Sequence, residues 1–190
     1  MTASSSPDND LLILVDPQDH EIGVLSKHEC HQGKGILHRA FSLFVFNRDG
    51  NLLLQQRSAD KPLWPLYWSN SCCSHPRLSE SIQVASQRRV MEELGFTCAA
   101  QYLYKFRYQA QYKNLGSEHE LCHVLFGYSD EPVRPNADEV ADWRYISPAE
   151  LTEEINTQAE QFTPWFKMEW QHISDNFLKE ILPGPGNSRI

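Results

Sequence analysis

The chain has 190 residues, 41% hydrophobic and 22% charged, which is ordinary for one globular domain that can bury a core of its own. Its formal net charge of -8 argues against general nucleic-acid binding, and no stretch approaches the roughly 20 apolar residues of a membrane span. Five cysteines cannot all pair, and the polar, acidic start lacks a signal-peptide pattern, so we expect a reduced, cytoplasmic protein.

The first half of the chain predicts strands and one long loop. Residues 1–9 are polar and are expected to form a disordered tail. Apolar, β-branched runs predict strands at residues 11–15, 37–47 and 52–57. The Asp49-Gly50 pair predicts a hairpin between the last two of these strands. Residues 58–78 contain three prolines and two tryptophans, which indicates a long functional loop.

The second half alternates helices with strands. A helix is predicted over residues 80–94, with Ser79 as its N-cap and Gly95 in the left-handed position that ends it. Further strands are predicted at residues 101–112, 119–128 and 143–146. The segment 147–150, Ser-Pro-Ala-Glu, supplies the N-cap, the proline and the glutamate of a helix start.

These elements predict one domain over residues 10–182. A last helix begins at Thr163-Pro164 and ends before the Pro-Gly run at 183–186. Strands interspersed with a few helices favour an α+β fold or a three-layer α/β/α sandwich, with a mixed, mostly antiparallel sheet. Residues 183–190 are expected to form a flexible tail.

The helix over residues 80–94 carries charged residues at a distinctive spacing. In isolation, an arginine three or four residues before a glutamate is typical of a surface salt bridge. Here the whole pattern resembles the Nudix signature, in which a glycine, a glutamate, an Arg-Glu pair and a Glu-Glu pair recur at fixed intervals. The matching positions are Glu80, Arg88, Val90, Glu92, Glu93, Gly95 and Phe96. The resemblance implies a Nudix-like fold that binds a diphosphate and a metal ion.

Two positions depart from that signature. Ser74 replaces the glycine, and Arg89 replaces the glutamate of the Arg-Glu pair. In Nudix hydrolases that glutamate belongs to the carboxylate cluster that grips the metal ions, so its replacement removes an acceptor and adds a cation. We therefore expect the helix to hold a diphosphate through Arg89 and a metal ion on Glu93, but to hydrolyse the diphosphate poorly.

A thiol and an imidazole precede this helix. Cys73 and His75 lie on either side of Ser74, and neighbouring cysteines in an extended chain cannot both face the same side. A free buried cysteine is usually a small hydrophobe, and a single histidine is usually structural. From the residues alone, either Cys72 or Cys73 could therefore be a catalytic thiol, and either could simply be packed in the core.

Other candidate metal ligands lie elsewhere in the chain. Glu118 and Glu120 are two apart on a predicted strand and therefore share a face, where two carboxylates are unfavourable unless a cation lies between them. His31 and His38 flank a glycine-containing loop. Together with His75, these residues make a nitrogen and oxygen set suited to zinc, manganese or iron.

Three segments together resemble type I isopentenyl-diphosphate isomerases, a branch of the Nudix superfamily. They are Asn-Ser-Cys-Cys-Ser-His-Pro at 70–76, Arg-Arg-Val-Met-Glu-Glu-Leu-Gly at 88–95 and Glu-His-Glu-Leu at 118–121. The resemblance extends from about Leu11 to Trp170. It implies an isomerase that interconverts isopentenyl diphosphate and dimethylallyl diphosphate by metal-dependent 1,3-proton transfer, supplying isoprenoid biosynthesis.

The resemblance also implies roles for individual residues. The implied ligands of one divalent metal, Mn²⁺ or Zn²⁺ (or Mg²⁺), are His31, His38, His75, Glu118 and Glu120. Glu93 is the implied ligand of a Mg²⁺ ion that bridges to the diphosphate. The implied catalytic residues are Cys73, Glu120, Tyr108 and Trp165. The implied diphosphate-binding residues are Lys27, Arg57, Lys61 and Arg89.

Two other functions remain open at this stage. One is a Nudix hydrolase of a nucleotide or isoprenoid diphosphate, against which Arg89 argues. The other is a non-enzymatic module for a metal or a partner, in which Cys73 would be inert. The expected partner is a small isoprenoid diphosphate rather than nucleic acid or a membrane, and the expected state is a monomer or weak homodimer. His28 is the nearest competitor of His31 as a metal ligand.

Overall fold

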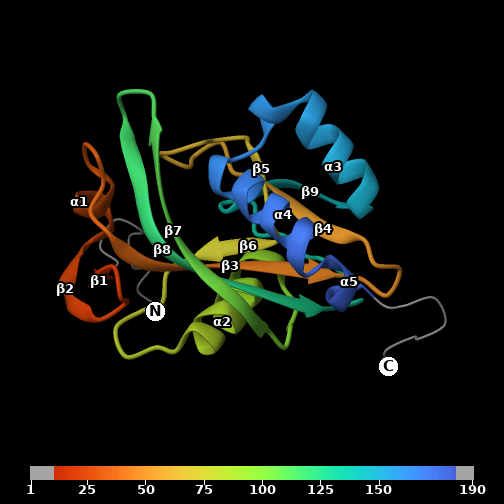
Figure 1. Ribbon diagram of the computed structural model, residues 1–190, viewed down its shortest axis with the longest axis horizontal. Helices are drawn as coiled ribbons and strands as arrows, with labels where there is room; N and C mark the ends of the chain where they lie inside the picture. Colours follow the sequence, from red (N-terminus) through yellow and green to blue (C-terminus); the bar gives the residue numbers. More distant parts are fainter. Residues whose placement is uncertain (1–10, 183–190) are drawn as a thin grey trace.

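The computed structural model describes residues 11–182, and the two predicted tails lie outside this range. Nine strands of the described part form one sheet, with helices around it (Figure 1). The strands are β1 (Leu11–Val15), β2 (Glu21–Ser26), β3 (His38–Phe46), β4 (Leu52–Arg57), β5 (Trp68–Ser69), β6 (Cys72–Ser74), β7 (Gln101–Tyr112), β8 (Gly116–Tyr128) and β9 (Val140–Ile146). The helices are α1 (Lys27–His31), α2 (Ile82–Leu94), α3 (Pro148–Thr157), α4 (Pro164–Asn176) and α5 (Leu178–Ile181), with a short 3-10 turn at Ala159–Gln161.

Strand β3 is the centre of the sheet, because it pairs with β1, β4, β6 and β8. Every pairing among the described strands is antiparallel except that of β3 with β8. The predicted Asp-Gly hairpin is present, with Phe46 opposite Leu52. The mixed, mostly antiparallel sheet predicted from the sequence is therefore confirmed.

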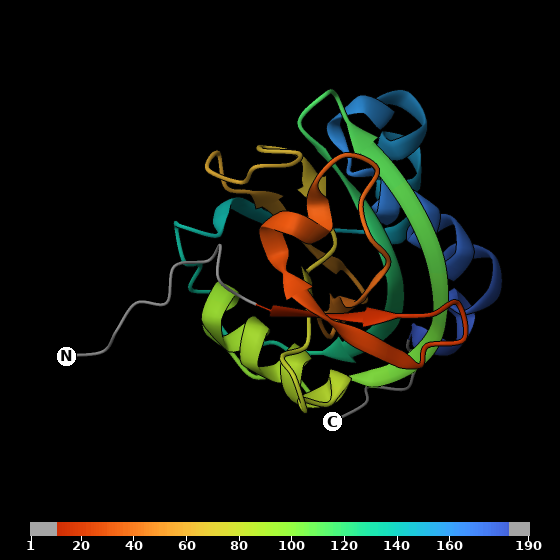
Figure 2. The same ribbon diagram turned by 90° about the vertical axis from the view of Figure 1, so that its left-hand side faces the viewer.

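Side chains alternate across β3 and fill two cores. Phe41, Leu43 and Val45 pack with α2 on one face of the sheet. Ala40 and Phe44 pack on the other face, with α3, α4 and α5. Figure 2 shows α2 on one side of the sheet and these three helices on the other. This alternation, which follows from the period of two in a strand, gives the predicted layered α/β/α arrangement.

Capping residues explain where the helices begin. Ser147 and Glu150 form a complete capping box at the start of α3, as the sequence predicts. The predicted start of α2 is wrong by two residues: Ser81, and not Ser79, caps the helix by accepting from the backbone N–H of Val84. Ser79 instead has a φ of 65° in the turn before it. Gly95 ends α2 in the left-handed conformation, as predicted.

Three further local expectations need correction. The segment 58–78 is not a plain loop, since it contains the short strands β5 and β6. Strand β8 begins at Gly116 and β9 at Val140, each three residues earlier than predicted. Strand β2 and helix α1 have no counterpart in the sequence-based prediction. Between residues 11 and 182, no helix combines the length and apolarity needed to span a bilayer.

Candidate active site

Five predicted metal ligands from four separate segments meet at one point. His31 comes from α1, His38 from the start of β3 and His75 from the residue after β6, while Glu118 and Glu120 share one face of β8. One nitrogen or oxygen atom from each of the five lies within 4.8 Å of the corresponding atom of every other. The pairing of β3 with β8 sets His38 beside Glu120, so the sheet register builds the cluster.

Backbone contacts orient two of the histidines. Nδ1–H of His31 donates to the carbonyl of Lys27 at 2.6 Å, and Nδ1–H of His38 donates to that of Ile36 at 2.7 Å. This tautomer leaves a lone pair on Nε2 of each ring, which is the atom that faces the cluster. Nε2 of His38 lies 3.1 Å from Nε2 of His75. The rings therefore present nitrogen lone pairs to a common point.

The two carboxylates complete the donor set. Oε2 of Glu118 lies 2.7 Å from Nε2 of His31, but this buried oxygen has no hydrogen-bond partner of suitable geometry in the described part of the chain. Oε1 of Glu120 lies 3.1 Å from Nε2 of His75, and Oε2 of Glu120 accepts from the Tyr108 hydroxyl at 2.7 Å. Converging lone pairs and an unpartnered carboxylate oxygen fit a divalent cation, so the cluster could hold one.

The charge states of the cluster suit metal binding. Burial lowers the pKa of His75 to about 4, against the opposing effect of Glu120, so its imidazole is neutral at pH 7. Burial alone would raise the pKa of Glu120, but its interactions with His38 and His75 outweigh burial and lower the pKa well below its usual range. A neutral imidazole and an ionised carboxylate are the forms that coordinate metals.

The two neighbouring cysteines face opposite sides of the sheet. Cys72 is fully buried with α2 in one core, whereas Cys73 packs against the other core, beneath α4. Burial raises the pKa of the Cys73 thiol to about 12, so Sγ keeps its proton at neutral pH. The register places Cys73 opposite Ser42 of β3, and Glu120 lies across β3 on the same face of the sheet.

Aromatic side chains cover this face. Trp165 of α4 is 3% exposed and contacts Trp64 and Tyr108, with ring centroids 5.3 and 6.1 Å apart. The Arg57 guanidinium lies over the Trp165 ring, 5.3 Å from its centroid. Burial raises the pKa of Tyr108 well above its usual value, so its hydroxyl remains a donor to Glu120. These aromatic side chains therefore pack between α4 and the sheet and are shielded from bulk solvent.

Two of the four predicted diphosphate-binding cations, Lys27 and Arg89, lie beside the metal cluster. A hollow is lined by Lys27, Ser74, His75, Arg77, Arg89 and Glu139, among others. Burial is the largest effect that lowers the pKa of Lys27, and the charge of Lys61 adds to it. Arg57 donates instead to the carbonyls of Leu63 and Trp64, at 2.8 and 3.0 Å. Lys27 and Arg89 therefore line this hollow, while Arg57 stands under the aromatic cover.

Glu139 is a charged residue of this hollow that the sequence reasoning missed. Its carboxylate pairs with Lys61 and, at 3.0 Å, with Nη2 of Arg89. Burial alone would raise the pKa of Glu139, but these two cations outweigh it and lower the pKa to about 2. Glu139 thus occupies the position of an anion between two predicted phosphate-binding cations. A single acidic residue in a polar loop carries no local signal of this role.

Glu93 lies outside the histidine cluster and is engaged by protein groups. Its Oε1 accepts from Nη2 of Arg89 at 2.5 Å, and its Oε2 accepts from Nε2 of Gln55 at 3.0 Å. Both oxygens of this predicted magnesium ligand are therefore occupied in the described structure. Each oxygen accepts one hydrogen bond and keeps a second lone pair, so the carboxylate could still hold a magnesium ion.

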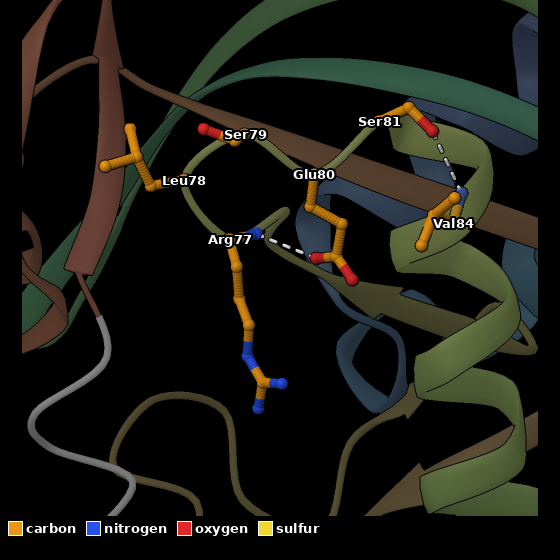
Figure 3. Close-up of a pocket in the computed structure, with 6 residues that line it drawn as sticks. All are labelled: Arg77, Leu78, Ser79, Glu80, Ser81 and Val84. Atoms are coloured by element: carbon orange, nitrogen blue, oxygen red, sulfur yellow. Dashed lines mark hydrogen bonds between the residues drawn. The ribbon is translucent and has the colours of Figure 1, made fainter.

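The turn at residues 77–81, just before α2, contributes no ligand to the cluster. Glu80, the first glutamate of the signature, accepts from Nε and Nη2 of Arg88, at 2.8 Å each. Its carboxylate also accepts from the backbone N–H of Arg77, as Figure 3 shows. The hollow in Figure 3 is lined by Arg77, Leu78, Ser79, Glu80, Ser81 and Val84. The Glu80–Arg88 pair therefore fixes the turn that joins β6 to α2.

Comparisons with known proteins agree with this fold and site. The model of the NUDIX domain matches residues 36–166, so the chain is a Nudix protein. A Deinococcus radiodurans protein of known crystal structure superposes with a TM-score of 0.64 at 20% identity, covering 78% of this chain and 90% of that chain. The MutT protein of Methanosarcina mazei superposes with a TM-score of 0.61 at 16% identity, covering 73% and 94%. These two likenesses concern the fold alone.

Relatives at higher sequence identity show which family of Nudix proteins the chain belongs to. Isopentenyl-diphosphate Delta-isomerase 1 of Photorhabdus laumondii is 43% identical over 172 residues, which cover 90% of this chain and 98% of that protein. The isopentenyl-diphosphate Delta-isomerase of Pectobacterium atrosepticum is 42% identical, over 86% and 91% of the two chains. The chloroplastic isopentenyl-diphosphate Delta-isomerase II of Arabidopsis thaliana is 39% identical, over 89% of this chain and 67% of that protein. The chain therefore belongs to the isopentenyl-diphosphate Delta-isomerase family.

Proposed function

We propose that this protein interconverts isopentenyl diphosphate and dimethylallyl diphosphate by proton transfers between Cys73, Glu120 and the five-carbon unit. The observation that carries the proposal is the placement of these two groups on either side of β3, under the aromatic cover of α4 and beside the metal-ligand cluster. A hydrolase would need neither a partly buried thiol at the site nor a cover that excludes water. Membership of the isomerase family supports the same conclusion.

The reaction adds a proton to one carbon of the substrate and removes one from another. A terminal CH₂ gains a proton, the double bond moves by one position, and the CH₂ next to the diphosphate-bearing carbon loses a proton. One group donates and the other accepts, and their roles are exchanged in the reverse direction. Sγ of Cys73 holds a proton, while Tyr108 donates to Glu120. The two groups can thus serve the two carbons of one flat substrate.

The remaining residues stabilise and confine the charge. The tertiary, cation-like species between the two steps would be trapped by water, so Trp165 and Trp64 exclude solvent. The π face of Trp165 also stabilises positive charge. A divalent cation, Mn²⁺, Zn²⁺ or Mg²⁺, held by the histidine and glutamate cluster would withdraw electron density from Glu120 and make a proton there more acidic.

The diphosphate takes no part in bond making, and its binding positions the hydrocarbon. Lys27 and Arg89 supply positive charge in the hollow beside His75, Lys61 pairs with Glu139 at the same hollow, and Arg57 adds charge under the aromatic cover. We propose that the diphosphate takes the place of the Glu139 carboxylate against Lys61 and Arg89. Glu93, which accepts a hydrogen bond from Arg89, would hold a Mg²⁺ ion, and this ion would neutralise part of the diphosphate charge.

Incubation with isopentenyl diphosphate in heavy water tests the proposal. We expect dimethylallyl diphosphate that carries deuterium in a methyl group, detected by mass spectrometry, because the added proton comes from a group that exchanges with solvent. Phosphate release is measured in the same samples and is expected to stay at background. Unchanged substrate would exclude the isomerase, and rapid phosphate release would support a diphosphate hydrolase instead.

Replacing Arg89 with glutamate is expected to weaken substrate binding without creating an efficient hydrolase. A charge-assisted hydrogen bond to a phosphate contributes about 1.5–3 kcal/mol, so KM should rise by about 10- to 150-fold. Arg89→Lys keeps the charge and loses the planar fork, and we expect a smaller rise. Initial-rate kinetics, with thermal unfolding as a check on folding, measure both. Fast phosphate release by Arg89→Glu would contradict the role assigned to this helix.

A further inference from the structure

A buried carboxyl group on α4 lies in the core against which Cys73 packs, and the mechanism above does not use it. Glu169 lies on α4, one turn after Trp165, and is 0% exposed. Its neighbours on this face of the helix are Trp165, Phe166, Trp170 and Ile173, all buried. Within residues 11–182, no arginine, lysine or histidine forms an ion pair with it. A charged residue type on an apolar helix face destabilises the fold unless its environment compensates.

The contacts of Glu169 compensate only in part. Sγ of Cys122 lies 3.5 Å from Oε1 of Glu169 and 3.4 Å from Oγ of Ser42, so the three side chains form one buried polar group. Oε2 of Glu169 is also buried and has no hydrogen-bond partner in the described part of the chain. Burial raises the pKa of Glu169 to about 8, so the carboxyl group is mostly neutral at pH 7.

The polar group of Glu169, Cys122 and Ser42 lies beside both proton-transfer residues, Cys73 and Glu120. Ser42 on β3 is the cross-strand partner of Cys73 on β6. Cys122 is two residues after Glu120 on β8 and therefore projects from the same face of the sheet. Glu169 thus links α4 to β3, which pairs with the strand of Cys73, and to β8, which carries Glu120. Each of the three side chains is at most 1% exposed, so water does not separate them.

We propose that Glu169 is a positioning residue of the isomerase reaction, whose carboxyl group, acting through Cys122 and Ser42, fixes the spacing between Cys73 and Glu120. The inference rests on the function proposed above. The reacting groups must meet two carbons of a small, flat unit, so an error of about 1 Å in their spacing lowers the rate about 100-fold. An apolar residue at position 169 would pack more easily than a buried carboxyl group, and it would leave Cys122 and Ser42 without this partner.

Two substitutions separate positioning from simple packing. Glu169→Met keeps the approximate size and removes both oxygens, while Glu169→Gln keeps an oxygen that can accept from Cys122. We expect Glu169→Met to unfold at the same temperature as the parent or above it, with kcat lowered about 10- to 100-fold and KM within about 3-fold. We expect Glu169→Gln to recover most of kcat, because a neutral amide resembles the neutral acid.

A third variant tests the route through the strands without altering α4. Ser42→Ala removes the β3 hydroxyl of the polar group and should also lower kcat more than it raises KM. Because the residues act as one unit, we expect the double variant Ser42→Ala, Glu169→Met to lose little more than either single variant. The Ser42→Ala variant alone remains decisive if Glu169→Met fails to fold. A parental kcat in folded Ser42→Ala would overturn the proposed action of Glu169 through Ser42.

The outcomes distinguish this inference from the proposed function. If the parent protein yields no dimethylallyl diphosphate, the proposed function is wrong and the inference fails with it. If the parent is active and folded Glu169→Met has the same kcat, the function stands and the positioning role is overturned. If Glu169→Met loses activity and Glu169→Gln does not recover it, a hydrogen bond from Cys122 does not set the spacing between Cys73 and Glu120. The inference is then likewise overturned.

Discussion

Cys73→Ala is expected to lower isomerase activity by at least about 100- to 10,000-fold, the range by which a positioned acid or base accelerates a reaction. The substitution removes the Sγ proton on one side of β3 and leaves Glu120 without its opposing group. Cys73 is only partly buried, so its loss should change the thermal unfolding temperature by a few degrees at most. Product formation from isopentenyl diphosphate, measured with the unfolding curve, tests both statements.

Cys72→Ala is the matched control. Cys72 is fully buried and packs against α2 on the opposite face of the sheet, away from Trp165 and Tyr108. Its truncation leaves a small cavity that lowers the free energy of unfolding by about 1 kcal/mol, but activity should stay within about 3-fold of the parent. The assignment of Cys73 fails if Cys73→Ala keeps parental activity, or if the two variants lose activity equally.

Removing divalent cations is the second change that we expect to have a large effect on isomerase activity. Dialysis against a chelator should abolish isomerase activity, and added Mn²⁺, Zn²⁺ or Mg²⁺ should restore it to an extent that identifies the preferred ion. The ion binds the folded cluster and not the unfolded chain, so at 100-fold excess over Kd it stabilises the fold by about 2.7 kcal/mol. Thermal unfolding with and without each ion therefore gives a readout that does not depend on the reaction.

Two histidines of α1 provide a matched pair for this experiment. His31→Ala removes a nitrogen that faces Glu118 and should abolish the stabilisation by metal. His28 lies outside the cluster, where its Nε2 contacts Gln32 at 2.8 Å, so His28→Ala should retain the stabilisation. Equal responses of the two variants to metal would remove His31 from the ligand set.

Metal affinity should also fall as the pH falls. Burial alone would lower the pKa of His31, but the Glu118 carboxylate outweighs it and raises the pKa above its usual value. A metal ion must displace the proton from this imidazole, so binding releases protons and weakens as the pH drops through that pKa. Metal titrations at several pH values measure the slope. An affinity independent of pH between 5 and 8 would contradict coordination by His31.

Local sequence rules located most elements but erred where two local signals compete. Ser79 and Ser81 are both acceptable N-caps, and the sequence pattern favoured the first. The structure uses Ser81, because Glu80 turns back to pair with Arg88 and so cannot join the helix. The short strands β5 and β6 form only by pairing with β4 and β3, so their own few residues carry little signal.

Two buried acidic residues illustrate different limits of the sequence. Glu169 interrupts the apolar face of α4, and a charged residue at such a position is a signal that periodicity alone could have detected. Glu139 follows an ordinary polar loop, and its importance arises only from contact with Lys61 and Arg89, which lie 78 and 50 residues earlier in the chain. No local pattern reveals that kind of partner.

The sequence by itself determined the strand and helix pattern, the Nudix-like helix with Arg89 in place of a carboxylate, and the candidate ligands. The element pattern follows from periodicity and capping, which act within a few residues along the chain, whereas the helix motif and the ligand set rest on the resemblance to Nudix isomerases. Only the tertiary structure decided that His31, His38, His75, Glu118 and Glu120 meet, that Cys73 and not Cys72 packs in the same core as Trp165, and that Glu169 contacts Cys122. The physical reason is that pairing of β3 with β6 and β8, and packing of α4 on their common face, bring together groups far apart in sequence.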